Sequence, residues 1–220
     1  MADLLPPGPL LLSLAAVLGL VISDLRGFRP GRYLCKPVAA AAFILLALAV
    51  GALDTTFGQW MLAALALCLV GDLCLMPDSD KTFLAGLGAF LLGHLLFGVA
   101  FLQLPLSTTG LLVSLPLVLL LLLVVRPWLL PSVPADMKGA VIAYVVVIGG
   151  MLLCAGATAG NPGAVAIIIG AWGFAISDLA VARQQFVKPS KWNGLWGTPL
   201  YFAAQMVLAA SIGLVTGTVA

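Results

Sequence analysis

The 220-residue chain contains few charged residues, a single histidine and no glutamate. Charged residues make up 8% of the sequence, against about 25% in an average soluble domain. Hydrophobic residues make up 63%, and the mean hydropathy is +1.20. A net charge of +2 on so few ionisable groups excludes a nucleic-acid binder, which needs a dense basic face. A chain this apolar cannot cover a water-facing surface, so we expect an all-α, polytopic membrane protein.

Apolar runs, cut at proline, glycine and charged residues, predict a bundle of eight transmembrane helices in one membrane domain, residues 1–220. The predicted spans are roughly 9–23, 36–53, 57–76, 82–104, 110–125, 138–159, 163–183 and 198–219. The first run is not read as a signal peptide, because it lacks a basic n-region and a cleavage site. The fifth span is short and contains Pro116. Merging or dropping it would place the two termini on opposite faces.

The basic residues predict the orientation of the bundle. All ten fall on odd-numbered connections between the predicted helices. They are Arg26, Arg29, Arg32 and Lys36; Lys81; Arg126 and Lys138; and Arg183, Lys188 and Lys191. Basic residues mark cytoplasmic loops, so we expect the odd connections in the cytoplasm and both termini outside. The high alanine, leucine and glycine content favours a bacterial inner membrane.

Two aspartates, Asp72 and Asp178, lie inside strongly apolar sequence, where an ionisable residue costs about 2.5–3.5 kcal/mol on insertion scales. Both lie near the cytoplasmic ends of their helices, and Lys36 is expected to begin the second helix at the same level. Tyr201 and Gln205 fall in the first two turns of the predicted eighth helix, on one face. We therefore expect one polar layer near the cytoplasmic side. Each residue also has a purely structural interpretation. Asp72 and Asp178 could form structural salt bridges, and Tyr201 and Gln205 could serve as an interfacial anchor and an interhelical hydrogen bond.

The histidine, His94, lies midway along the predicted fourth helix. It belongs to a stripe at helical spacing that also contains Phe83, Phe90, Phe97 and Phe101. A stripe of this kind is typical of packing, so a structural histidine and a functional one are both consistent with the pattern. With one histidine and no glutamate, and with four cysteines that have no metal-ligand spacing, we expect no metal site and no cofactor.

A short internal echo suggests two parallel four-helix halves. Lys36 precedes Gly71-Asp72, and Lys138 precedes Ser177-Asp178 at a similar distance, each lysine opening the second span of its half. Such halves would face each other across an axis along the membrane normal.

Several of these residues together resemble the lysoplasmalogenase family of membrane proteins, known in bacteria as the YhhN-like family. The matching pieces are Lys36-Pro37, Gly71-Asp72, Phe83…Gly86…Phe90…His94, Gly170…Phe174…Ser177-Asp178 with Phe186, and Tyr201…Gln205. One departure is Phe97, at a position after the histidine where a tyrosine is expected.

The resemblance implies an eight-helix hydrolase that cleaves the vinyl-ether bond of lysoplasmalogens into a fatty aldehyde and a glycerophospho-head group. Its partners would be the lysophospholipid substrate and the lipid bilayer. A protonated carboxylic acid can donate to the alkene carbon, and a second, ionised carboxylate can stabilise the resulting cation; Asp72 and Asp178 fit these roles. The residues expected to bind substrate are Lys36, His94, Ser177, Tyr201 and Gln205.

Other functions compete with this interpretation. A small proton-coupled transporter could use the same carboxylates, although polar groups gathered on one side favour a site entered from one face. An intramembrane aspartyl protease would carry a Gly-x-Gly-Asp run, whereas Leu69-Val70-Gly71 precedes Asp72. A serine hydrolase would need a motif such as GxSxG, which is absent. A purely structural protein is a further alternative.

Overall fold

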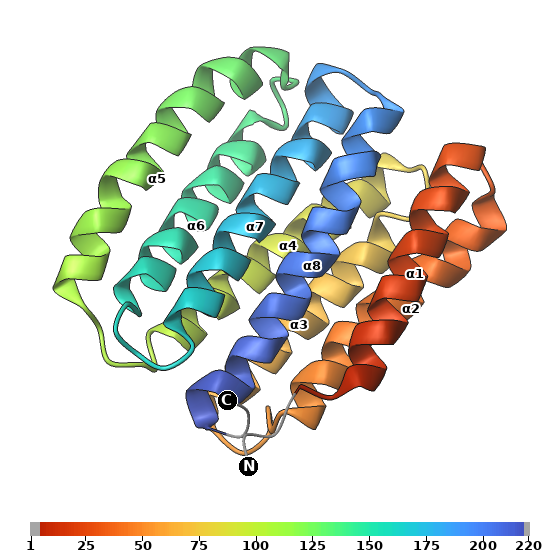
Figure 1. Ribbon diagram of the computed structural model, residues 1–220. Coiled ribbons are helices and arrows are strands. Elements are labelled where there is room, and N and C mark those ends of the chain that lie inside the picture. Colours follow the sequence, from red (N-terminus) through yellow and green to blue (C-terminus); the bar gives the residue numbers. More distant parts are fainter. Residues whose placement is uncertain (1–4, 218–220) are drawn as a thin grey trace.

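The computed structural model describes residues 5–217, which form a bundle of eight long helices without a β-strand (Figure 1). The helices are α1 (Pro7–Arg26), α2 (Arg29–Ala49), α3 (Thr56–Cys74), α4 (Asp80–Phe101), α5 (Thr108–Leu129), α6 (Lys138–Ala157), α7 (Ala164–Ala182) and α8 (Lys191–Thr216). A 3-10 turn, Leu130–Ser132, follows α5, and a π-helical turn, Arg183–Val187, follows α7. Within the described range, all eight helices are long and apolar enough to cross a membrane. The all-α prediction with eight spans is confirmed.

The second helix begins seven residues earlier than predicted, at Arg29 instead of Lys36. Gly27 ends α1 in the left-handed conformation, with φ of 66°, which suits glycine because it has no Cβ. Pro30 then lies in the first turn of α2, where its missing N–H costs nothing. Lys36 therefore lies about two turns inside α2, and the prediction that it opens the helix is wrong.

The eighth helix also begins earlier than predicted, at Lys191. The hydroxyl of Ser190 accepts a hydrogen bond from the Trp192 N–H and caps the helix. Tyr201 and Gln205 therefore lie in the third and fourth turns, and their predicted place in the first two turns is wrong. The Pro199 ring is accommodated inside this helix, as is common in membrane helices.

The fifth helix is longer than its predicted span. It runs from Thr108 to Leu129 and contains both Pro116 and Pro127. The Ser107 hydroxyl caps its start by accepting from the Gly110 N–H at 3.1 Å. This span is neither merged nor dropped, so α1 begins and α8 ends at the same end of the bundle (Figure 1).

The helices differ in how much they contribute to the core. Helix α8 is the most buried and packs against α7, α1, α2 and α3, whereas α5 lies at one side against α6 (Figure 1). The contact between α7 and α8 is close at Gly197, where a Cβ would collide with Ala180. Small residues at such contacts let membrane helices approach each other. Asp72, Asp178 and Tyr201 are thereby carried on tightly packed helices.

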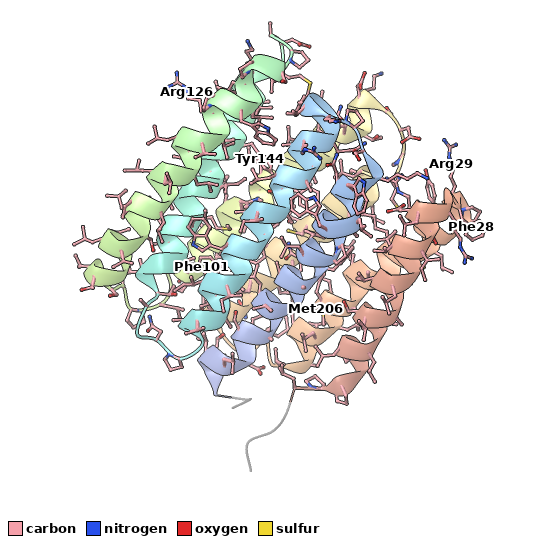
Figure 2. The ribbon with its side chains drawn as sticks, turned by 45° about the horizontal axis from the view of Figure 1, so that its top comes forward. Phe28, Arg29, Phe101, Arg126, Tyr144 and Met206 are labelled. Atoms are coloured by element: carbon pink, nitrogen blue, oxygen red, sulfur yellow. The ribbon has the colours of Figure 1, made fainter. Side chains whose placement is uncertain are left out.

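All odd-numbered connections lie at one end of the bundle, which we call the basic end because the ten basic residues lie on or near it (Figure 1). Figure 2 shows Arg29 and Arg126 there, away from Phe101 and Met206. This distribution is what the positive-inside rule needs. The orientation in the membrane, the single domain over residues 1–220 and the two parallel halves stay predictions. The extreme termini lie outside the described residues.

Candidate active site

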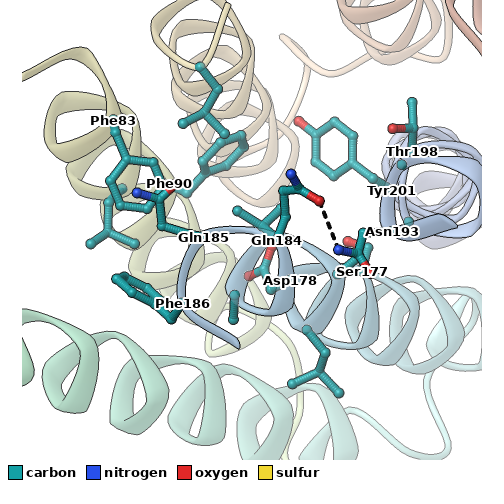
Figure 3. Close-up of a pocket in the computed structure, with 18 of the residues that line it drawn as sticks. Phe83, Phe90, Ser177, Asp178, Gln184, Gln185, Phe186, Asn193, Thr198 and Tyr201 are labelled. Carbon is teal, nitrogen blue, oxygen red and sulfur yellow. Dashed lines mark hydrogen bonds between the residues drawn. The ribbon is translucent and has the colours of Figure 1, made fainter. Parts of the chain in front are cut away.

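A cavity of about 700 Å³ opens at the basic end of the bundle (Figure 3). Its mouth is formed by the last turn of α1, the first turns of α2, and parts of the α3–α4 and α7–α8 connections. Its walls include Lys36, Asp72, Tyr144, Ser177, Asp178 and Tyr201. Five helices thus bring their polar side chains to one space, as expected for a small-molecule site.

Asp72, on α3, has a basic and a hydroxyl partner. The Lys36 Nζ atom lies 3.2 Å from its Oδ1 atom, and the Tyr201 hydroxyl donates to its Oδ2 atom at 2.7 Å. The Asp72 side chain is only 3% exposed and that of Lys36 14%. A buried carboxylate is tolerated when a cation and hydrogen-bond donors match its charge. The Asp72 group has both.

Asp178, on α7, also accepts from a tyrosine but has no lysine or arginine in ion-pair contact within residues 5–217. The Tyr144 hydroxyl donates to its Oδ2 atom at 2.8 Å. The Nε2 atom of His94 lies 3.3 Å from the same oxygen. The Asp178 side chain is 13% exposed, and none of the described residues contacts its Oδ1 atom through a hydrogen bond. This carboxyl is therefore the more accessible of the two.

The His94 ring is fully buried behind the cavity wall. Its Nδ1 atom lies 2.7 Å from the Phe90 carbonyl oxygen. The ring stacks on Phe174 at a centroid distance of 4.1 Å and meets Tyr144 edge-on at 5.4 Å. These contacts fix both the position and the rotation of the imidazole. His94 thus packs within the predicted phenylalanine stripe and also contacts Asp178.

Of the predicted substrate contacts Gln205 and Ser177, only Ser177 lines the cavity. Gln205 is fully buried, does not line the cavity, and neither atom of its amide has an oxygen or nitrogen partner among the described residues. Its amide does lie near the Cys68 thiol. Ser177 lines the cavity, but its hydroxyl donates to the Phe174 carbonyl at 2.7 Å. The structure therefore gathers Lys36, Asp72, Ser177, Asp178 and Tyr201 around the cavity, with His94 and Gln205 behind its wall.

Tyr144 is the main site residue that sequence reasoning missed. It is one of only three tyrosines in the chain, and it lies inside the apolar sequence of α6. A buried tyrosine hydroxyl usually has a hydrogen-bond partner, so its position was a usable signal. Which carboxyl it would reach depends on how α6 packs against α4 and α7.

The rim of the cavity contains a second missed group, centred on Asn193. This buried side chain accepts from the Arg183 guanidinium, and it donates to Gln184 Oε1 at 2.8 Å and to the Lys188 carbonyl at 2.9 Å. Figure 3 shows the bond between Gln184 and Asn193. These bonds brace the π-helical turn after α7. The eighth span was predicted to begin at residue 198, which left Asn193 in a loop. Helix α8 begins at Lys191, so Asn193 lies in its first turn.

Lys138 does not take a place like that of Lys36. It begins α6 and borders a separate, shallow hollow beside Arg126 and Pro127. The two lysines of the internal echo therefore have different surroundings. Among residues 5–217, no three His, Cys, Asp or Glu side chains cluster closely enough to hold a metal ion.

Eight apolar helices around a cavity that contains a few buried polar side chains define an integral, multi-pass membrane protein. Residues 31–212 match the YhhN family, and the chain belongs to that family. It is also 32% identical to the lysoplasmalogenase TMEM86B of Sus scrofa over 182 residues, which cover 81% of this chain and 73% of that protein. No solved structure matches the chain significantly. The resemblance read from the sequence is confirmed at the level of the family.

Proposed function

We propose that this protein hydrolyses the vinyl-ether bond of lysoplasmalogens, releasing a fatty aldehyde and a glycerophospho-head group such as glycerophosphoethanolamine or glycerophosphocholine. The observation that carries the proposal is the presence of two carboxyl groups, Asp72 and Asp178, on the wall of one cavity. The relationship to a lysoplasmalogenase supports the same substrate class.

The chemistry needs an acid and a negative charge in one site. Protonation of the outer alkene carbon turns a vinyl ether into an oxocarbenium ion, which water captures as a hemiacetal. The hemiacetal then collapses to aldehyde and alcohol. Glycosidases use one carboxylic acid and one carboxylate against a similar cation. Asp72 and Asp178 supply such a pair, and this reaction needs no metal or organic cofactor.

The cavity also suits the shape of a single-chain phospholipid. Arg32, Lys36 and Lys191 line it toward the basic end, where cationic side chains favour a phosphate. Leu121, Val145 and Ile148 line an apolar part between α5 and α6, which suits the hydrocarbon chain. The head group would then lie at the mouth, with the vinyl ether near the two aspartates. Ser177 and Tyr201 contact the substrate from the wall, whereas His94 and Gln205 act from behind it.

A proton-coupled transporter is the second candidate, because buried carboxylates also serve proton transfer. A carrier alternately exposes its site to both membrane faces. The lining of this cavity contains no residue from the connections at the opposite end, around residues 50–55, 102–107 and 158–163. This one-ended access favours the hydrolase.

The deciding experiment gives the purified protein a lysoplasmalogen and, in parallel, the matching saturated ether lipid. Aldehyde release from the first lipid alone supports the hydrolase. Proton uptake into proteoliposomes without any aldehyde would favour the transporter.

We further propose that the basic end faces the cytoplasm of a bacterial inner membrane, with both termini outside. Phe28 and Leu53 are exposed at opposite ends of α2. In a cysteine-free background, Leu53→Cys should react with an impermeant thiol reagent on intact spheroplasts, whereas Phe28→Cys should react only after lysis. The reverse pattern would invert the orientation.

A further inference from the structure

The hydrogen bonds of His94 determine where a proton must lie. The Nδ1 atom of the ring is 2.7 Å from the Phe90 carbonyl oxygen. A carbonyl oxygen only accepts hydrogen bonds, so Nδ1 carries a hydrogen. In a neutral imidazole the other nitrogen, Nε2, then has a lone pair and no hydrogen.

The Nε2 atom faces Asp178. It is buried and has no aligned hydrogen bond with any described residue, and Asp178 Oδ2 lies 3.3 Å from it. If the ring were neutral and the carboxyl ionised, two lone pairs would face each other in a buried place. An unsatisfied buried polar group costs about 1–3 kcal/mol. One proton between Nε2 and Oδ2 removes the conflict, whether it resides on the carboxyl or on the ring.

The groups around Asp178 do not supply another positive charge. His94 contacts it from α4 and Tyr144 from α6, and Cys68 on α3 and Tyr201 on α8 lie near enough to interact electrostatically. Asp72 differs, because the Lys36 ammonium lies 3.2 Å away. A proton on Asp72 would leave that ammonium without its counter-charge in a buried place.

We propose that Asp178 is the general acid, that Asp72 is the ionised carboxylate, and that His94 is a positioning residue that keeps the transferable proton on Asp178. This assignment rests on the proposed hydrolysis of a vinyl ether. The Oδ1 atom of Asp178, which has no hydrogen bond with any of residues 5–217, is available to face substrate. A half-turn of the carboxyl exchanges its two oxygens and presents the proton to the cavity.

The reaction then balances as follows. The alkene electron pair forms a C–H bond with the Asp178 proton, which leaves Asp178 as a carboxylate and the substrate as an oxocarbenium ion. Water forms a C–O bond to the cationic carbon and gives a proton to Asp178, which restores the acid. The hemiacetal C–O bond to glycerol breaks, and the hemiacetal hydroxyl proton moves to the leaving oxygen. Asp72 keeps its charge throughout and stabilises the cation.

The first test needs no substrate, because His94 is the only histidine in the chain. Nitrogen-15 NMR of histidine-labelled protein in nanodiscs therefore reports one ring. We expect Nδ1 to be protonated, and the Nε2 signal to move in Asp178→Ala but not in Asp72→Ala. A ring protonated at Nε2, either alone or together with Nδ1, would overturn the assignment, since Nε2 would then simply donate to an ionised Asp178. This result is independent of whether the protein hydrolyses lysoplasmalogens.

The second test separates the acids by chemical rescue. Both Asp178→Ala and Asp72→Ala should lose about 10²–10⁴-fold in aldehyde release. Imidazolium, a small cationic acid, should restore Asp178→Ala by about tenfold or more, because it replaces a missing proton donor, and should not restore Asp72→Ala, because a cation cannot replace a carboxylate. Rescue of Asp72→Ala alone, or of neither variant, would overturn the assignment. Absence of aldehyde from the unmodified protein would instead refute the proposed function, whatever the NMR result.

A third variant tests His94 itself. In His94→Gln the amide N–H would donate to Asp178 and favour its ionised form. We expect a lower kcat with an unchanged KM, and loss of activity on the alkaline side at a lower pH than in the unmodified protein. A purely structural histidine would reduce the amount of folded protein and leave the pH profile of the remainder unchanged, which would contradict the positioning role.

Discussion

The carboxyl groups of Asp72 and Asp178 each accept a hydrogen bond from a tyrosine, but their second partners differ. Tyr201 donates to Asp72 and Tyr144 to Asp178, at nearly equal distances. The second partner is a lysine in one case and the only histidine in the other. A membrane helix tolerates an acid at this depth when its charge is matched or its proton retained. Asp72 has the matching charge, and in the proposed mechanism Asp178 keeps its proton, so the pair would supply both forms that an acid–base reaction requires.

The largest expected effect comes from removing either acid without changing its volume. Asp72→Asn and Asp178→Asn should each reduce turnover per folded molecule by about 10²–10⁴-fold, because asparagine neither donates an acidic proton nor carries charge. Aldehyde release normalised to monodisperse protein is the measurement. Asp136→Asn, an exposed aspartate that does not line the cavity, is the matched control and should remain active. Near-normal turnover in either site variant would remove that aspartate from the mechanism.

Removing the lysine should affect stability more than any other change on the Asp72 side. Lys36→Met leaves Asp72 buried without its cation, which costs about 3–5 kcal/mol. Thermal unfolding in detergent should therefore begin at a clearly lower temperature. The double variant Lys36→Met with Asp72→Asn should recover most of the loss, because no unpaired charge remains. A double variant as unstable as Lys36→Met alone would mean that lost packing, and not charge, explains the effect.

The hydrogen bonds from Tyr201 to Asp72 and from Tyr144 to Asp178 can be compared by removing each hydroxyl. Hydrogen bonds to charged groups are stronger than those to neutral groups. Tyr201→Phe should therefore destabilise the fold by about 1.5 kcal/mol, near the upper end for membrane proteins, and Tyr144→Phe by about 0.6 kcal/mol, near the average. Chemical denaturation in mixed micelles measures both. Equal losses would argue that Asp72 and Asp178 carry the same charge.

The smallest effect is expected at Lys138, the lysine that the internal echo pairs with Lys36. It begins α6 beside a shallow hollow and has no part in the cavity. Lys138→Ala should change the unfolding free energy by no more than about 0.5 kcal/mol and leave aldehyde release unchanged. A loss comparable to that of Lys36→Met would restore the idea that the two lysines are equivalent.

The eight helices could be predicted because apolar runs of this length are typical of transmembrane helices. Their ends could not, since the rule that excludes charged residues from a span also excluded Arg29 to Cys35 and the first turns of α8. Arg32 shows why a basic residue can be helical there, because its guanidinium donates to the Leu75 carbonyl at the end of α3. Such a contact depends on tertiary packing.

The site was predicted in part. The structure brings Lys36, Asp72, Asp178 and Tyr201 to one cavity, as polar residues at similar depth in apolar helices predicted, but leaves Gln205 outside it. The roles of these residues stay predictions. Which polar side chains contact Asp72 and which contact Asp178 was not predictable. It depends on the rotation of α6, which brings Tyr144 to Asp178, and on the Phe174 stack that directs His94 toward the same carboxyl.

The Lys36–Asp72 contact also bears on how the chain enters the membrane during synthesis. Helix α2 carries its lysine about two turns inside its length, and the matching aspartate belongs to α3, the next helix to emerge from the ribosome. A charged residue within a helix makes insertion of that helix alone unfavourable by about 2.5–3.5 kcal/mol. Helices α2 and α3 should therefore leave the translocon together as a hairpin, with the ion pair already formed.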